Sequence, residues 1–142
     1  MSKKRIAFQG ELGANSHEAA LTNFPAYEPA PHASFEDAFE AIKSGDCELG
    51  LIPVENSTAG RVADVHHLLP SSGLKIIGER FMPIHFHLMA NPGVKLEDVK
   101  TVQSMAIALG QCRRFIRGRN FRTEPVGDTA GAARMLGDNP DP

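Results

Sequence analysis

Short apolar runs that suit β-strands alternate along this chain with segments whose apolar residues recur at helical spacing. Residues 5–8 and 48–54 predict strands, whereas residues 34–45 predict a helix with apolar side chains at positions i, i+3, i+4 and i+7. Ser34 and Asp37 stand at the spacing of a capping box at the start of that helix. Because alternating strands and helices pack as helices over a common sheet, the pattern predicts an α/β fold with mostly parallel sheets.

The rest of the chain continues this alternation. Further helices are predicted at residues 16–24, 57–73, 106–119 and 128–137, and further strands at residues 74–90, 99–104 and 121–126. Side chains that suit a helix N-cap precede or open these helices, namely Ser16, Ser57, Thr58, Ser104, Asp128 and Thr129. Pro70 and Gly73 are expected to end the second of these helices.

Composition and charge exclude several classes of protein. The formal net charge of −2, one Tyr and no Trp disfavour a nucleic-acid-binding module. No window holds the roughly 18 apolar residues of a membrane span, and the first residues lack the apolar run of a signal peptide. We therefore expect a cytoplasmic protein that binds neither nucleic acid nor membrane, with Cys47 and Cys112 as unpaired thiols.

Three polar clusters follow predicted strands and precede predicted helices. They lie at residues 55–58 (Glu-Asn-Ser-Thr), at 104–111 between Ser104 and Gln111, and at Asp128 and Thr129. In open α/β sheets, ligands bind beyond the carboxyl ends of the strands, where helix N-termini also favour anions. The clusters therefore predict a cleft for a small anionic molecule, without a cofactor fingerprint or a nucleophile–base pair.

Other polar features favour simpler interpretations. His85 and His87 would share one face of a strand and could ligate zinc, but no further ligand stands at a suitable spacing. Gly10 and Gly13 can form either an anion-binding turn or a plain turn before a helix. The arginines at residues 113–119 are interpreted as a solvated helix face.

Several motifs together resemble the catalytic domain of the prephenate dehydratase family. They are Pro-Val-Glu-Asn-Ser at residues 53–57, Ala-Leu-Gly-Gln-Cys at 108–112 and Asp-Thr-Ala-Gly-Ala-Ala at 128–133. The resemblance extends over essentially all 142 residues in the order of the family. Met105 departs from it, because the family usually has His there.

The resemblance implies a two-lobed α/β architecture like that of the type II periplasmic solute-binding proteins, with lobes at residues 1–77 and 78–142. It implies a lyase of phenylalanine biosynthesis that converts prephenate to phenylpyruvate without cofactor or metal. We also expect a homo-oligomer, because without the family's later elements sheet edges and apolar faces would be left uncovered. The resemblance places Asn56, Ser104 and Gln111 at catalytic positions. Residues expected to line the substrate site are Glu55, Ser57, Thr58 and Thr129.

The resemblance also implies that the chain is incomplete at its C-terminus. The family's Thr-Arg-Phe motif, whose threonine serves the leaving hydroxyl, does not occur here, and neither does the regulatory domain of the ACT type. We therefore expect this chain to be weakly active or inactive alone. The alternative is a non-catalytic module of the same two-lobed fold that binds small anions.

Overall fold

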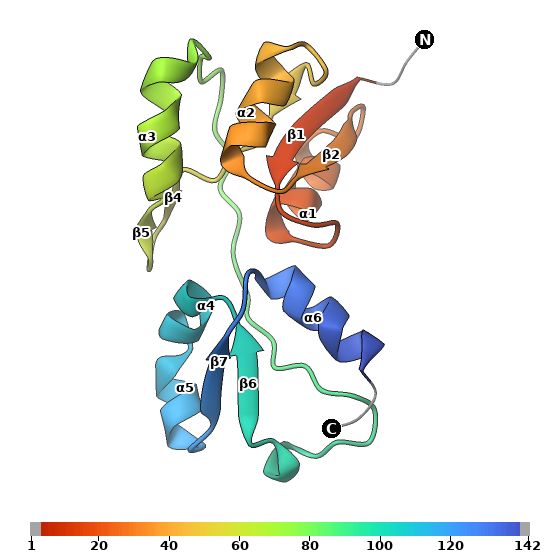
Figure 1. Ribbon diagram of the computed structural model, residues 1–142, viewed down its shortest axis with the longest axis vertical. Coiled ribbons are helices and arrows are strands. Elements are labelled where there is room, and N and C mark those ends of the chain that lie inside the picture. The colour runs from red at the N-terminus through yellow and green to blue at the C-terminus, as the bar shows by residue number, and fades with distance from the viewer. Residues whose placement is uncertain (1–3, 140–142) are drawn as a thin grey trace. The chain divides into compact units, whose positions relative to one another are not determined.

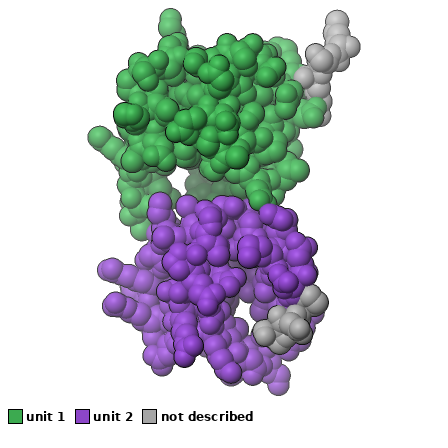
Figure 2. All heavy atoms as spheres, in the orientation of Figure 1, with its two compact units in different colours: residues 1–84 green, residues 85–142 purple. Residues whose placement is uncertain are grey.

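The computed structural model describes residues 4–139 and divides the chain into two compact units, residues 1–84 and 85–142 (Figure 2). The boundary expected after residue 77 lies in the same connecting segment as the observed one. Each unit contains parallel strands with helical crossovers (Figure 1), which confirms the predicted α/β fold. No helix within residues 4–139 is long and apolar enough to span a membrane.

The first unit is built on a three-stranded parallel sheet of order β2-β1-β3. Strand β1 (Arg5–Gln9) is central and pairs in register with β2 (Glu28–His32) and with the short β3 (Leu49–Gly50). Strand β2 was missed in the sequence because Pro29 and Pro31 argue against a strand. Both fit here because β2 is an outer strand, where proline costs no ladder hydrogen bond.

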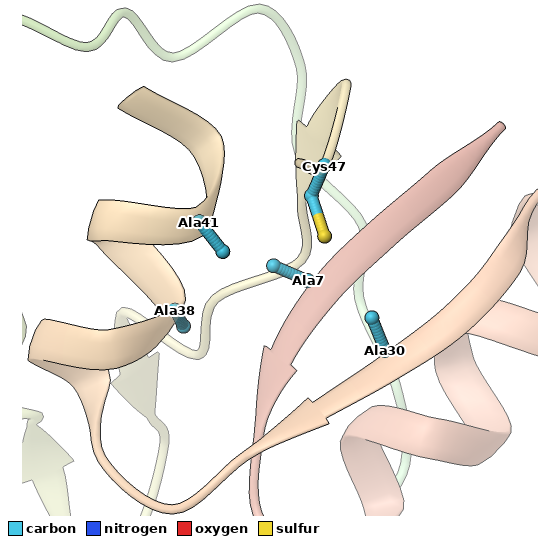
Figure 3. Packing of buried hydrophobic residues seen from close by; sticks show 5 residues of the cluster. All are labelled: Ala7, Ala30, Ala38, Ala41 and Cys47. Carbon is cyan, nitrogen blue, oxygen red and sulfur yellow. The ribbon is translucent and has the colours of Figure 1, made fainter. Parts of the chain in front are cut away.

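Helices α1 (Asn15–Asn23) and α2 (Phe35–Lys43) cover opposite faces of this sheet. Successive residues of β1 point to opposite faces. Ala7 packs with Ala38 and Ala41 of α2 in a cluster that includes Ala30 and Cys47 (Figure 3). The Phe8 ring, on the other face, lies 5.7 Å from the His17 ring of α1, centroid to centroid.

Small residues bring α2 close to the sheet. A Cβ at Gly50 would collide with the end of the Ile42 side chain, which would have to shift to make room. Cys47 is almost fully buried, and this burial raises the pKa of its thiol. The predicted cap of α2 is confirmed, because Ser34 Oγ accepts a 3.1 Å hydrogen bond from the Asp37 N–H.

The first unit continues with the hairpin of β4 (Glu55–Asn56) and β5 (Gly60–Arg61) and with helix α3 (Ala63–Ser72). The helix continues past Pro70 and ends at Gly73, which has a left-handed φ of 75°. Its Val65 side chain is fully buried.

The second unit is a two-stranded parallel sheet, β6 (Thr101–Ser104) and β7 (Arg122–Pro125), preceded by the 3₁₀ turn η1 (Leu96–Asp98). The predicted helix at 106–119 is two helices, α4 (Ala106–Gln111) and α5 (Arg113–Gly118), because the chain breaks at Cys112. Helix α6 (Thr129–Asp138) follows β7. Val102, Ala108 and Ile116 form the buried apolar positions of this crossover.

The strand predicted at residues 74–90 is wrong. The segment connects the units without pairing to any strand of the described chain (Figure 1). The Arg80 guanidinium lies 5.9 Å from the Phe24 ring centroid, and the Asn91 side chain donates a 2.9 Å hydrogen bond to the Asn139 carbonyl. Large apolar side chains are exposed between these two contacts, including Phe81 at 90% and Met89 at 61%.

Candidate functional site

Asn56 organises the polar segment that follows the first sheet. Its Oδ1 accepts 2.9 Å hydrogen bonds from the backbone N–H groups of Thr58 and Ala59. This Asx-type turn closes the β4–β5 hairpin, and Gly60 supplies the positive φ of 84° that the hairpin requires. The side-chain oxygen of Asn56 therefore holds the hairpin backbone in position.

The hairpin also determines where the neighbouring polar residues lie. Glu55 lies opposite Arg61 in the antiparallel register of the two strands, and its side chain is exposed. Ser57 and Thr58 lie in the turn, and neither caps a helix, because α3 begins after Val62. The cap predicted for these two residues is wrong since the chain inserts a hairpin between the strand and the helix.

Ser104 and Thr129 lie at one edge of the second sheet. Ser104 ends β6 opposite Pro125 of β7, and its carbonyl accepts a 3.0 Å hydrogen bond from the Val126 N–H. Thr129 opens α6 a few residues after β7. Because the two strands are parallel, their carboxyl ends place both hydroxyl-bearing residues at the same edge.

Gln111 lies at the opposite end of α4 from Ser104. It is the last residue of that helix, is partly buried and immediately precedes the break at Cys112. Asn56 belongs to the first unit, whereas Ser104, Gln111 and Thr129 belong to the second.

Helix N-termini differ in whether a side chain caps them. Ser34 caps α2 and Asp128 caps α6. In contrast, α1, α3 and α4 have Ala14, Val62 and Met105 at the N-cap, without a side-chain hydrogen bond. The caps predicted for Ser16 and Ser104 are therefore wrong, because the N-cap residues of α1 and α4 are Ala14 and Met105.

Two polar side chains at the edge of the first sheet were not singled out from the sequence. Gln9 ends β1, and its amide lies 3.4 Å from the Ala33 carbonyl, while His32 ends β2. The Nε2 atom of His32 is buried and has no hydrogen-bond partner within the described chain. Gln9 could have been found from its position directly after the strand predicted at residues 5–8, whereas His32 gave no such signal because β2 was not predicted.

The candidate residues offer amide, hydroxyl and backbone N–H groups. Such groups orient carboxylates and hydroxyls by hydrogen bonds, but amides and aliphatic hydroxyls are not acids near neutral pH. Residues 4–139 contain no group of three or more His, Cys, Asp and Glu side chains that could hold a metal ion. The chemistry that this donor set suits is the binding and polarisation of a small anion.

Comparison with known proteins supplies the family context. A family model described as prephenate dehydratase matches residues 6–142. Arogenate dehydratase 2 of Petunia hybrida is 39% identical over 135 residues, which make up 95% of this chain and 34% of that protein. A bifunctional N-acyl-homoserine lactone acylase/prephenate dehydratase of Komagataeibacter europaeus is 38% identical over 131 residues, or 92% of this chain and 47% of that protein.

The fold has a counterpart among solved structures. The prephenate dehydratase from Arthrobacter aurescens, solved in complex with L-Phe, superposes with a TM-score of 0.83 at 31% identity. The match covers 93% of this chain and 45% of that chain. The chain thus spans between a third and a half of the length of these relatives.

Proposed function

The chain belongs to the prephenate dehydratase family, and on that premise we propose that its protein converts prephenate to phenylpyruvate in phenylalanine biosynthesis. The single observation that carries the proposal is the family match, which extends over residues 6–142 and contains every candidate site residue. The amide and hydroxyl side chains among the candidate residues support it, because prephenate carries two carboxylates that accept hydrogen bonds.

The reaction makes limited demands on the protein. The ring carboxylate leaves as CO₂, its bonding electrons enter the ring, and the ring hydroxyl departs with one added proton as water. The ring thereby becomes aromatic, and no electron acceptor is consumed. The protein has to orient the dianion and supply a proton or hydrogen bond to the departing oxygen.

Asn56, Ser104 and Gln111 are the proposed orienting groups. Glu55, Ser57, Thr58 and Thr129 are the proposed lining of the substrate site. General acid catalysis contributes about 10²- to 10⁴-fold in rate. Since the amides and hydroxyls orient substrate but are poor acids, we assign them to binding and positioning.

The free thiols of Cys47 and Cys112 suit a reducing compartment, so we propose a cytoplasmic location. We also propose a homo-oligomer. Fractionation of the source cells tests the cytoplasmic location. Light scattering of the purified protein tests the homo-oligomer.

The test is product formation from two substrates. The purified protein is incubated with prephenate and, separately, with arogenate, the aminated relative that loses water and CO₂ to give phenylalanine. Phenylpyruvate from prephenate supports the proposal, whereas phenylalanine from arogenate with no phenylpyruvate identifies an arogenate dehydratase. If calorimetry detects prephenate binding by the full-length protein but neither product forms, the protein is a small-anion binding module.

A second candidate activity comes from one relative. The Komagataeibacter europaeus protein carries an N-acyl-homoserine lactone acylase description beside its dehydratase one. Incubation of the protein with an N-acyl-homoserine lactone, with release of homoserine lactone as the readout, tests that activity separately.

A further inference from the structure

A histidine in α1 holds the turn between β1 and α1, residues 10–14. The Nδ1 atom of His17 accepts a 3.0 Å hydrogen bond from the Gly13 N–H. His17 is the third residue of α1. In a capping box, the side chain at this position reaches back to the N–H of the N-cap residue, whereas His17 reaches one residue further. The bond requires a ring nitrogen without a proton, because a protonated one donates instead of accepting.

The same imidazole ring packs against the first sheet. Its centroid lies 5.7 Å from that of Phe8, and the two ring planes are inclined by 32°. Phe8 belongs to β1 and is fully buried, so it fixes the position of the imidazole. His17 therefore connects a rigid strand with the turn that follows it, since its ring contacts β1 and its Nδ1 holds Gly13.

The backbone of the turn depends on this side chain. The Gly10 N–H donates a 2.9 Å hydrogen bond to a carbonyl of β2, and the Ala14 N–H donates a 3.1 Å hydrogen bond to the Glu11 carbonyl. Both of these bonds join backbone to backbone, whereas the one from Gly13 ends on His17. Gly13 has a left-handed φ of 92°, so its backbone has wide conformational freedom. Loss of the Nδ1 acceptor should therefore loosen the turn and leave the sheet intact.

The turn lies at the edge of the first sheet where the chain also enters the Asn56 hairpin. Strands β1 and β3 are parallel, and the Ala7 carbonyl accepts a 2.8 Å hydrogen bond from the Leu51 N–H. The turn follows the carboxyl end of β1, and the chain that continues from β3 enters β4 at Glu55. Ligands of open parallel sheets bind beyond this edge. His17 thus holds a loop at the edge that carries a proposed substrate-orienting group.

We propose that His17 is a positioning residue of the substrate site, which keeps the turn at residues 10–14 in the conformation that binds substrate. The inference rests on the proposed function. His17 acts through the Gly13 N–H and does not itself touch the substrate. If the substrate binds only the ordered turn, its apparent affinity falls with the fraction of molecules in which the turn is ordered. The competing interpretation is that His17 serves packing alone, through its contact with Phe8.

Two substitutions separate the acceptor from the ring. His17→Asn places an amide oxygen as many bonds from the backbone as Nδ1, so it keeps the acceptor and loses the ring. His17→Phe keeps a ring and has no acceptor. In the full-length protein we expect His17→Phe to raise KM about two- to tenfold, the equivalent of one hydrogen bond, with a melting temperature near that of the wild type. His17→Asn should melt at a lower temperature, because the ring contact with Phe8 is lost, but keep the wild-type KM.

The two kinetic constants distinguish positioning from folding. A variant that only unfolds more readily loses rate at saturating substrate, while the molecules that remain folded keep their KM. Asn23→Ala is the matched control, because it removes a 2.9 Å side-chain hydrogen bond to the Ala19 carbonyl at the other end of α1. Its KM should equal that of the wild type. An increase in KM as large as that of His17→Phe would mean that any weakening of α1 has this effect, and would overturn the proposal.

Hydrogen exchange tests the turn without any turnover. Residues 10–14 should exchange faster in His17→Phe than in the wild type, and at nearly the wild-type rate in His17→Asn. Equal exchange in the wild type and His17→Phe overturns the proposal, because the turn then does not depend on the acceptor. So does a KM that rises equally in the Phe and Asn variants, because the ring would then be responsible.

Failure of this inference can be told apart from failure of the proposed function. If the full-length wild type converts neither prephenate nor arogenate, the proposed function fails and the substrate role of His17 falls with it. If the wild type is active and His17→Phe keeps the wild-type KM, only the role of His17 is refuted.

Discussion

The Asp128 carboxylate accepts a 2.6 Å hydrogen bond from the Gly131 N–H and thereby caps helix α6. A Cβ at position 131 would lie 2.8 Å from the Asp128 carboxylate. Such a separation is too short, so an alanine at position 131 would require the Asp128 carboxylate to shift from its place in the cap. Thr129, a proposed site residue, lies between them and is held by this cap.

Gly131→Ala is expected to destabilise the protein although alanine is the better helix former. The new methyl group forces Asp128 away and removes a helix cap, which costs about 1 kcal/mol. Gly137→Ala in the same helix is the matched control, because nothing lies within 4 Å of a Cβ there. Urea unfolding should show a loss for the first variant and no loss for the second; equal effects would mean that the Asp128 contact is not the cause.

In the full-length protein, Asn56→Ala is expected to lower kcat/KM, because the hairpin loses the acceptor that binds the Thr58 and Ala59 N–H groups. Loss of one oriented hydrogen bond to a charged substrate costs roughly 1.5–3 kcal/mol, or about 10- to 150-fold. Asn56→Asp retains the acceptor but adds a negative charge. It should preserve the hairpin amide signals in NMR spectra and still lose activity on a dianion; full activity in either variant would remove Asn56 from the site.

In the full-length protein, Gln111→Ala should reduce kcat/KM by a similar factor without lowering the melting temperature by more than a few degrees. Its matched control is Gln103→Ala on β6, whose exposed amide donates a 2.7 Å hydrogen bond to Glu124. The control removes the same functional group from a surface pair and should leave activity unchanged. If both variants have the same kinetics, the role proposed for Gln111 is wrong.

Glu48 makes stability depend on pH at the acid end. Hydrogen bonds from Lys4 (2.9 Å) and then from Tyr27 (3.0 Å) hold the pKa of Glu48 below its usual 4.5. A lowered pKa in the folded state means that the stabilisation is present above pH 4.5 and is lost as the pH falls through the lowered value. All three groups are at the surface, so the effect is small.

The variant Glu48→Gln isolates this contribution. The difference in melting temperature between wild type and variant should be constant from about pH 5 to pH 9 and shrink below the usual carboxylate pKa. A difference that grows on acidification would contradict this assignment to Glu48.

Lys4 makes stability depend on pH at the alkaline end. The pKa of Lys4 is raised above 10.5, chiefly by the hydrogen bond to Glu48, so the stabilisation that Lys4 contributes is complete below that pH and is lost above it.

The sequence by itself determined where helices α2 and α6 begin. Helix α2 was predicted with its Ser34 cap because a helix makes its hydrogen bonds within one segment, so apolar spacing and capping residues suffice. Helix α6, with Asp128 as a candidate cap, was predicted for the same reason. The motifs at residues 53–57, 108–112 and 128–133 also indicated the family that the comparisons show.

Only the tertiary structure decided which extended segments become strands. Residues 84–89 alternate as a strand would, yet they pair with nothing in the described chain, whereas the proline-containing β2 pairs along all of β1. Residues 55–61 form a hairpin where a helix start was expected. A strand obtains its hydrogen bonds from a neighbour that can lie anywhere in the sequence, so local pattern predicts its faces but not its partner.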